Sequence, residues 1–221
     1  MKINIAIDGP SAAGKSTIAD ILADKLGYTH LDTGAMYRAV AFECFKEGIA
    51  IDDEDKVVNM ISNMNLDMRP DGKVILNGED ISNKIRTNEI SMGASNVSKL
   101  LNVRAALVKM QQEICKQGGY ILDGRDIGTV VLKDAPVKIF MIASPEARAI
   151  RRVEQNKEKG IEGDDYDTIL QEIQKRDYQD SHRQNSPLKQ ADDAILIDTS
   201  NLTIEETSDK VMSLVKEKLG E

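Results

Sequence analysis

The chain of 221 residues contains no tryptophan, and aromatic residues make up only 4% of it. Its core must therefore rest on aliphatic side chains, and the sequence offers no aromatic platforms for stacking single-stranded nucleic-acid bases. Cysteine is also scarce. Cys44 and Cys115 stand far apart without the spacing of zinc ligands, which favours buried thiols in a reducing compartment.

Long apolar segments and an excess of positive charge are lacking as well. The apolar stretch at the amino terminus ends at Asp8, too early for a signal peptide or a membrane span, and no other run reaches that length. The formal net charge of -8 argues against nonspecific nucleic-acid binding, because lysine and arginine must neutralise phosphates. We therefore expect a cytoplasmic protein, a monomer by default, that binds neither membrane nor nucleic acid.

The composition that remains, 41% hydrophobic and 30% charged, is typical of a globular domain. Helical patterns alternate with short apolar segments typical of strands, at residues 3–7, 28–31, 119–122, 137–143 and 194–197. This alternation predicts a doubly wound α/β fold, in which helices cover both faces of a five-stranded parallel sheet. The last helix is expected to begin with a capping box formed by Thr203 and Glu206 and to end at Leu219.

Two intervals interrupt this alternation. Residues 65–82 contain Asp71-Gly72 and Asn77-Gly78, two strong hairpin signals that predict a small antiparallel three-stranded insert between the second and third strands of the sheet. Residues 155–167 are charged, contain two glycines and lack apolar periodicity, which predicts a mobile loop. Arginines flank this loop on both sides, so the sequence is compatible with a functional lid as well as with a passive solvated loop.

The segment GPSAAGKS, residues 9–16, fills every fixed position of the phosphate-binding loop (P-loop) pattern G-x-x-x-x-G-K-[ST]. It follows a predicted strand and opens a predicted helix, so its backbone N–H groups and the helix N-terminus are expected to bind phosphates. The lysine should reach the β- and γ-phosphates, and the serine hydroxyl should bind Mg²⁺. The predicted ATP-binding residues here are Gly9, Pro10, Ser11, Ala12, Ala13, Gly14, Lys15, Ser16 and Thr17.

A second metal-binding residue is expected at the end of another strand. The apolar segment 119–122 runs into Asp123, the pattern of a carboxylate on a strand beside a P-loop. At that place Asp123 would hold Mg²⁺ together with Ser16, directly or through water. An aspartate in an ordinary strand-end turn would produce the same pattern.

Polar residues that suit a second anion follow two strands. Thr33 can cap the helix after the second strand, and Arg38 lies about one turn further along. Arg125 and Asp126 come just past the third strand, offering a bidentate fork for phosphate and an acceptor for amine donors. Doubly wound folds bind ligands at these carboxyl ends of strands.

Arginines also lie on the two helices that flank the charged loop. Arg176, Asp180 and Arg183 stand at i, i+4 and i+7 on one helix, and Arg148 shares a face with Arg151 or Arg152 on the other. Surface salt bridges would explain the same spacing. In a P-loop protein, however, arginines in these places suit a closing lid that clamps a transferring phosphoryl group.

The reaction would need no general base if the acceptor were itself a phosphate monoester with an ionised oxygen. This fits the histidines, because we expect His30 to be structural and His182 to be exposed.

Four segments in this order, DGPSAAGKST, LDTGAMYR, LDGRDIGT and RDYQDSHR, resemble the bacterial cytidylate kinase family of nucleoside monophosphate kinases. The resemblance spans residues 3–216. It implies transfer of the γ-phosphoryl group of ATP to CMP or dCMP with Mg²⁺. It also implies a single kinase domain over residues 1–221, with a core of residues 1–32, 101–154 and 184–221, a monophosphate-binding insertion over residues 33–100 and a lid over residues 155–167.

The same resemblance assigns roles to individual residues. Thr33, Arg38 and Arg125 would hold the CMP phosphate, and Ser95, Arg104 and Asp126 would read the cytosine edge. Asp180 and Arg183 would contact the sugar. The residues implied in catalysis are Lys15, Arg125, Arg176 and Arg183, and those implied at ATP beyond the P-loop are Arg148 and Arg152. Which of Arg148, Arg151 and Arg152 reaches ATP stays open.

Other P-loop proteins remain alternatives. A regulatory GTPase would carry Asn-Lys-x-Asp, but neither Asn83-Lys84 nor Asn156-Lys157 is followed by that aspartate. A nucleic-acid-associated ATPase or a plain nucleotide-binding module fits the acidic composition and the lack of aromatic platforms poorly. The nearest alternative is another small-molecule kinase on the same scaffold, acting on shikimate, gluconate or uridylate.

Overall fold

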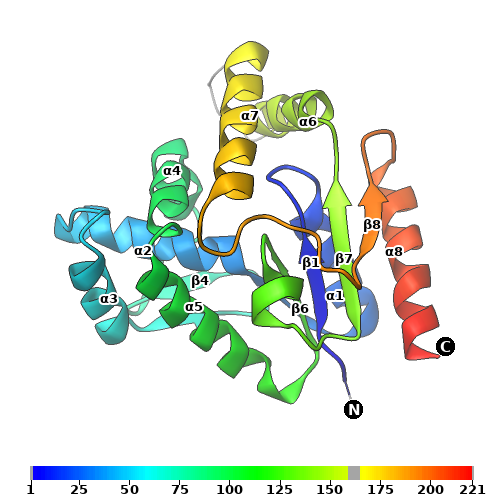
Figure 1. Cartoon of the computed structure of the whole chain (residues 1–221), viewed down its shortest axis with the longest axis horizontal. Helices are drawn as coiled ribbons and strands as arrows, with labels where there is room; N and C mark the ends of the chain where they lie inside the picture. Colours follow the sequence, from blue (N-terminus) through cyan, green and yellow to red (C-terminus); the bar gives the residue numbers. More distant parts are fainter. Residues whose placement is uncertain (1, 159–164, 221) are drawn as a thin grey trace.

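The computed structural model describes residues 2–158 and 165–220, and its centre is a five-stranded parallel sheet. The strand order is β2-β6-β1-β7-β8, and all four neighbouring pairs are parallel (Figure 1). The strands are β1 Ile5–Asp8, β2 Thr29–Asp32, β6 Tyr120–Gly124, β7 Val137–Ile142 and β8 Ile195–Asp198. The predicted five-stranded doubly wound sheet is confirmed.

Helices cover both faces of this sheet because its strands are apolar on both sides. Ile5 and Ile7 belong to a buried cluster with α1 (Lys15–Leu26) and α8 (Ile204–Leu219), whereas Ala6 belongs to the cluster on the other face. That second cluster includes side chains of α2 (Thr33–Glu47), α3 (Glu54–Asn63) and α5 (Leu101–Ile114). The capping box of α8 is present, with Thr203 and Glu206 bonded reciprocally.

The chain between β2 and β6 contains the small antiparallel sheet that the hairpin signals predict. It consists of β3 Leu66–Met68, β4 Val74–Leu76 and β5 Glu79–Asp80, in the order β3-β4-β5. Asn77 and Gly78 both adopt positive φ, 51° and 86°, which is why an Asn-Gly pair suits this turn. The segment continues through a short 3₁₀ turn, Lys84–Arg86, into α4 (Asn88–Val97), which packs on α2.

The division of the chain into core and insertion stays a prediction. Residues of α3 inside the proposed insertion, such as Val57, share one buried cluster with Val103 and Leu107 of α5 and with Leu122 of the sheet. After α5 the chain passes through a 3₁₀ turn, Cys115–Gln117, into β6. A π-helical turn, Ile127–Val131, then connects β6 with β7.

The predicted loop over residues 155–167 was too long at both ends. Helix α6 (Pro145–Glu158) includes its first residues, and α7 (Tyr166–His182) includes its last two, with Asp165 capping the backbone N–H of Thr168 at 2.8 Å. Most of these added helical residues are polar or charged and lie outside the apolar contact between α6 and α7, which Ala149 and Ile169 form with other side chains, so apolar periodicity could not reveal them. Residues 159–164 lie outside the described part. Among the described residues, none of the helices combines the length and the apolar composition that a membrane span requires.

Candidate active site

A large cleft opens at the carboxyl ends of β1, β2 and β6, where a doubly wound sheet binds its ligands. Its volume is about 1190 Å³. The P-loop lines one part of it, and side chains from α2, α4, α5 and α7 line the rest. The cleft therefore has room for more than one ligand.

The P-loop combines strained backbone with close packing on β7. A Cβ on Gly9 would lie 2.0 Å from the carbonyl oxygen of Met141, so only glycine fits where the loop leaves β1. Ala12 and Gly14 have φ of 58° and 90°, in the left-handed region. Because Gly14 precedes α1 and has no side chain, the first N–H groups of that helix stay available to an anion.

Lys15 lies under this loop, and its Nζ donates to the carbonyl oxygen of Pro10 at 2.7 Å. Burial, followed by the nearby Arg125, lowers the Lys15 pKa to about 7. A desolvated cation beside another cation gains most from an anion brought next to it. The position of Lys15 thus favours phosphate binding.

Ser16 and Asp123 come together as the sequence predicts. The Ser16 hydroxyl donates to Asp123 Oδ2 at 2.8 Å, and the Asp123 backbone oxygen accepts from Thr33 Oγ1 at 2.7 Å. Over the described residues, no group of three or more His, Cys, Asp or Glu side chains could hold a metal by itself. A hydroxyl and one carboxylate suit Mg²⁺ that arrives with phosphate oxygens completing its coordination.

The predicted cap at Thr33 was wrong. The capping residue of α2 is Asp32, whose Oδ1 accepts from the Ala35 N–H at 2.9 Å, while Thr33 is the first helical residue. Asp32 Oδ2 also accepts from Arg38 at 2.7 Å. Asp32 is the capping residue because its carboxylate accepts from both the Ala35 N–H and the Arg38 guanidinium. The Thr33 hydroxyl instead donates to the backbone oxygen of Asp123.

Two of the three predicted cytosine-reading residues, Arg104 and Asp126, pair with each other. Arg104 of α5 is buried, pairs with Asp126, and donates to the Ser98 carbonyl oxygen at 3.1 Å. Its guanidinium lies 5.5 Å from the centre of the Tyr37 ring. Ser95 of α4 is buried at the same cleft and donates to Gln179 at 3.4 Å. These side chains come from four helices and one loop.

Two arginines meet at Asp180 of α7. Arg125 Nε donates to Asp180 Oδ2 at 2.9 Å, and Arg183 lies 4.0 Å from the carboxylates of both Asp180 and Asp126. Asp180 accordingly keeps a lowered pKa: burial alone would raise it, but Arg125 and the neighbouring cations outweigh that effect. One network of alternating charge therefore joins Arg104, Asp126, Arg183, Asp180 and Arg125, while Arg38 pairs separately with Asp32.

Arg176 differs from these arginines in having no side-chain hydrogen bond or ion pair among the described residues. Its Nε is buried without a hydrogen-bond partner, as Arg104 Nε is, and the residue lines the cleft. Burial and the adjacent Arg125 lower the pKa of Arg176 to about 10. A cation in this position is ready to bind a further anion.

The arginines of α6 separate into two groups. Arg148 is buried, forms a bidentate pair with Asp177, and donates to the carbonyl oxygens of Ala143 and Ser11, so that it supports the P-loop from behind. Arg151 and Arg152 line the cleft. Contact of Arg148 with ATP would require its pair with Asp177 to open.

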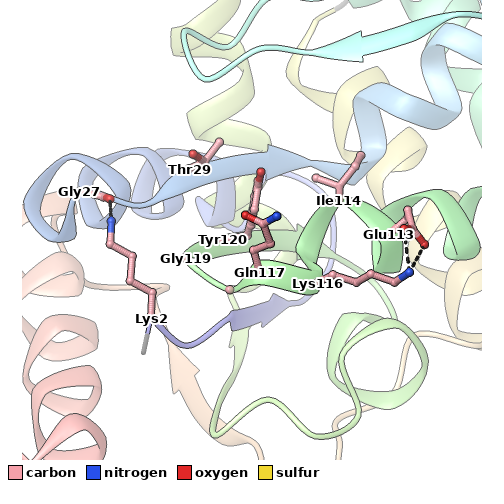
Figure 2. A pocket seen from close by; sticks show the side chains of 10 residues that line it. Lys2, Gly27, Thr29, Glu113, Ile114, Lys116, Gln117, Gly119 and Tyr120 are labelled. Carbon is pink, nitrogen blue, oxygen red and sulfur yellow. Dashed lines mark hydrogen bonds and ion pairs between the residues drawn. The ribbon is translucent and has the colours of Figure 1, made fainter.

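A second hollow, of about 460 Å³, lies away from this site, at the amino ends of β2 and β6 (Figure 2). Among its lining residues, Lys2 donates to the Gly27 carbonyl oxygen and Lys116 pairs with Glu113 at 2.6 Å. Its charged groups are satisfied locally, and the P-loop residues do not reach it. The chemistry therefore belongs to the larger cleft.

A family model described as cytidylate kinase matches residues 5–217. The chain belongs to the cytidylate kinase family. A cytidylate kinase from Caldicellulosiruptor saccharolyticus is 50% identical, over 99% of this chain and 98% of the relative. A cytidylate kinase from Bacillus subtilis is 47% identical, with 98% of each chain covered. The family resemblance noted in the sequence is confirmed.

Solved structures show that this cytidylate kinase family member shares its fold with more distant proteins. A gluconokinase from Sinorhizobium meliloti superposes with a TM-score of 0.52 at 13% identity, covering 99% of this chain and 97% of its own. An uncharacterized protein from Eubacterium ventriosum has a TM-score of 0.57 at 12% identity, covering 97% and 99%. At such identities the likeness concerns the fold alone.

Sequence reasoning missed Asp8 of this family member. It is buried at the end of β1 and accepts from the N–H groups of Ile127 and Gly128 at 2.8 and 2.7 Å. These bonds fix the turn that follows Arg125 and Asp126. Burial raises the Asp8 pKa to about 6, against the opposing effect of the two N–H groups. The sequence offered one sign of this role, because Asp8 is a charged residue directly after an apolar segment predicted to be a strand.

Proposed function

We propose that this member of the cytidylate kinase family transfers the γ-phosphoryl group of ATP to CMP or dCMP, releasing ADP and CDP or dCDP. The observation that carries the proposal is the division of the cleft. A P-loop with an open helix N-terminus lies at one end, and a network of arginines with Asp126 and Asp180 lies at the other. A hydrolase would have no use for the second half.

In the acceptor half, Thr33, Arg38 and Arg125 would bind the phosphate of the monophosphate. The two arginines are already held by Asp32 and Asp180, so they are ordered and largely desolvated before the ligand enters. Binding then requires little reorganisation, and the incoming phosphate shares or replaces these carboxylates.

Base recognition would fall to Ser95, Arg104 and Asp126, and sugar contact to Asp180 and Arg183. Ionised Asp126 accepts hydrogen bonds only, so it suits the amino group of cytosine and repels the carbonyl group that uracil presents there. A site built around a buried polar group discriminates strongly, because the wrong base leaves that group unpaired.

For the transfer itself, Lys15, Arg125, Arg176 and Arg183 would stabilise the charge that develops on the moving phosphoryl group. The acceptor phosphate oxygen is ionised at neutral pH, so the residues only need to align it and exclude water. The P-loop from Gly9 to Thr17 and Arg152 would hold ATP, and Arg148 would act through its hydrogen bond to the Ser11 carbonyl oxygen of the P-loop.

Mg²⁺ would be held by Ser16 directly and by Asp123 directly or through water. When bound, the ion neutralises charge between the β- and γ-phosphates. The 2.8 Å bond between the two side chains shows that they already face one point beside the P-loop. A cytoplasmic location remains our expectation from the cysteine usage and the short apolar segments, and a monomer remains the default.

The test is a coupled assay of ADP release with CMP, dCMP, UMP, AMP and GMP as acceptors. We expect CMP or dCMP to give the highest kcat/KM and UMP a lower one. AMP or GMP as the best acceptor would refute the assignment of the acceptor half, and ADP release independent of any acceptor would refute transfer altogether.

A further inference from the structure

His30 has no role in the reaction as described, but it connects Asp123 with Asp20 through hydrogen bonds beside the P-loop. Its Nε2 lies 2.9 Å from Asp123 Oδ1, and its Nδ1 lies 2.6 Å from Asp20 Oδ1. Because ionised carboxylates only accept hydrogen bonds, the imidazole donates at both nitrogens. The ring is mostly buried, with 12% of its side chain exposed.

The chain of bonds begins and ends on the same helix. Ser16 donates to Asp123 Oδ2 at 2.8 Å, and Asp123 is bonded through His30 to Asp20. Ser16 and Asp20 stand four residues apart on α1, so they lie on one face of it. Three elements, α1, β2 and β6, are thus joined through the Asp123 carboxylate.

This arrangement holds Asp123 at both oxygens. The torsion that turns an aspartate carboxylate is broad, so one hydrogen bond from Ser16 leaves its plane poorly defined. A second donor on Oδ1 fixes the plane and keeps Oδ2 on the side of Ser16. When the serine hydroxyl turns toward a metal ion, His30 still holds the other oxygen.

We propose that His30, supported by Asp20, is a positioning residue for the metal site, which keeps the Asp123 carboxylate directed at the Mg²⁺ that accompanies ATP. The inference rests on the proposed function only in taking Ser16 and Asp123 as the metal-binding side chains. Partners of this kind behind metal ligands typically change metal affinity by about 10–100-fold.

The experiment measures Mn²⁺ binding to the protein in the presence of ADP, by electron paramagnetic resonance. His30→Leu removes both donors at similar volume, and His30→Gln keeps a donor near the Nε2 position. We expect H30L to weaken Mn²⁺ binding by about 10–100-fold and H30Q to restore most of the loss. ADP affinity in EDTA should stay at the wild-type level for both variants.

Asp20→Ala tests the outer end of the chain, and Asp24→Ala is its matched control. Both remove a carboxylate from an exposed position of α1, one turn apart, but only Asp20 contacts His30. We expect D20A to weaken Mn²⁺ binding and D24A to leave it unchanged. These two variants decide the question if H30L does not fold.

Three results would overturn the proposal. They are wild-type Mn²⁺ affinity in folded H30L, equal losses in H30L and H30Q, and equal affinities in D20A and D24A. The equal losses would mean that a hydrogen-bond donor near the Nε2 position is not what His30 contributes to the metal site. Because no CMP is used, the outcome is independent of the acceptor panel, so a wrong acceptor assignment and a wrong role for His30 are distinguishable.

Discussion

The two halves of the cleft bind phosphate by different means. The donor half is one continuous segment, residues 9–17, which acts through backbone N–H groups, a helix terminus and Lys15. The acceptor half is assembled from side chains of α2, α4, α5, α7 and the turn after β6. Backbone groups bind any phosphate, whereas dispersed side chains can distinguish one base from another.

The halves also differ in whether their cations have carboxylate partners. Arg38, Arg104 and Arg125 each have an aspartate partner, while Lys15 donates only to a carbonyl oxygen among the described residues. A paired arginine is ordered before binding, and an unpaired buried cation gains more from the incoming phosphate. We therefore expect substitutions in the donor half to affect the rate and those in the acceptor half to affect acceptor binding.

The largest effect is expected from Lys15→Ala. Removing this cation should lower kcat about 10³-fold, because it acts on charge that develops during transfer. CMP binding, measured by calorimetry, should stay close to wild type. Lys25→Ala, at an exposed position of the same helix, is the control. A K15A variant with nearly wild-type kcat would remove the distinction between the halves.

Arg183→Ala should chiefly weaken acceptor use. Its guanidinium lies 4.0 Å from Asp126 and Asp180, so its loss leaves two buried carboxylates without that cation. We expect KM for CMP to rise about 10–100-fold, the size of a lost charge-assisted hydrogen bond. Steady-state kinetics with CMP varied at saturating ATP measure this KM. Lys175→Ala, at an exposed position of α7, is the control. An R183A variant with an unchanged KM for CMP and a lower kcat would contradict the role of Arg183 at the sugar and leave only its role in the transfer.

Asp126→Asn should relax the choice of base. The amide presents an N–H as well as an oxygen, so it can face the carbonyl of uracil. We expect the ratio of kcat/KM for CMP over UMP to fall about 10-fold. Asp134→Asn, an exposed carboxylate after the same turn, should leave the ratio unchanged. The expectation fails if D126N lowers both activities equally.

The smallest expected effect is the contribution of Asp32 to the pH dependence of the unfolding free energy. Although burial alone would raise the Asp32 pKa, Arg38 and the other groups around it lower it to about 2 in the folded state, compared with 3.8 ordinarily. Its stabilisation is therefore complete above pH 3.8 and is lost as pH falls through 2. Wild type should lose about 1–2 kcal/mol more of its unfolding free energy than Asp32→Asn between pH 5 and pH 2, in urea titrations. Equal losses would show that the pair contributes nothing.

Local patterns were sufficient for the elements of the fold. The P-loop was predictable because its glycines, lysine and serine are consecutive, and the turn at Asn77-Gly78 because both residues tolerate positive φ. The ends of α6 and α7 were missed, since solvent-exposed helical turns carry no apolar periodicity. The start of α7 is set by Asp165, whose side chain caps that helix.

The sequence by itself determined the alternation of strands and helices, the P-loop and the small antiparallel sheet, because each depends on residues near one another in the chain. Only the tertiary structure decided the strand order and the partners inside the cleft. It places β6 between β1 and β2, which brings Asp123 to both Ser16 and His30. It also joins Arg104 to Asp126. Such contacts connect distant segments and depend on packing across the sheet, which no local pattern encodes.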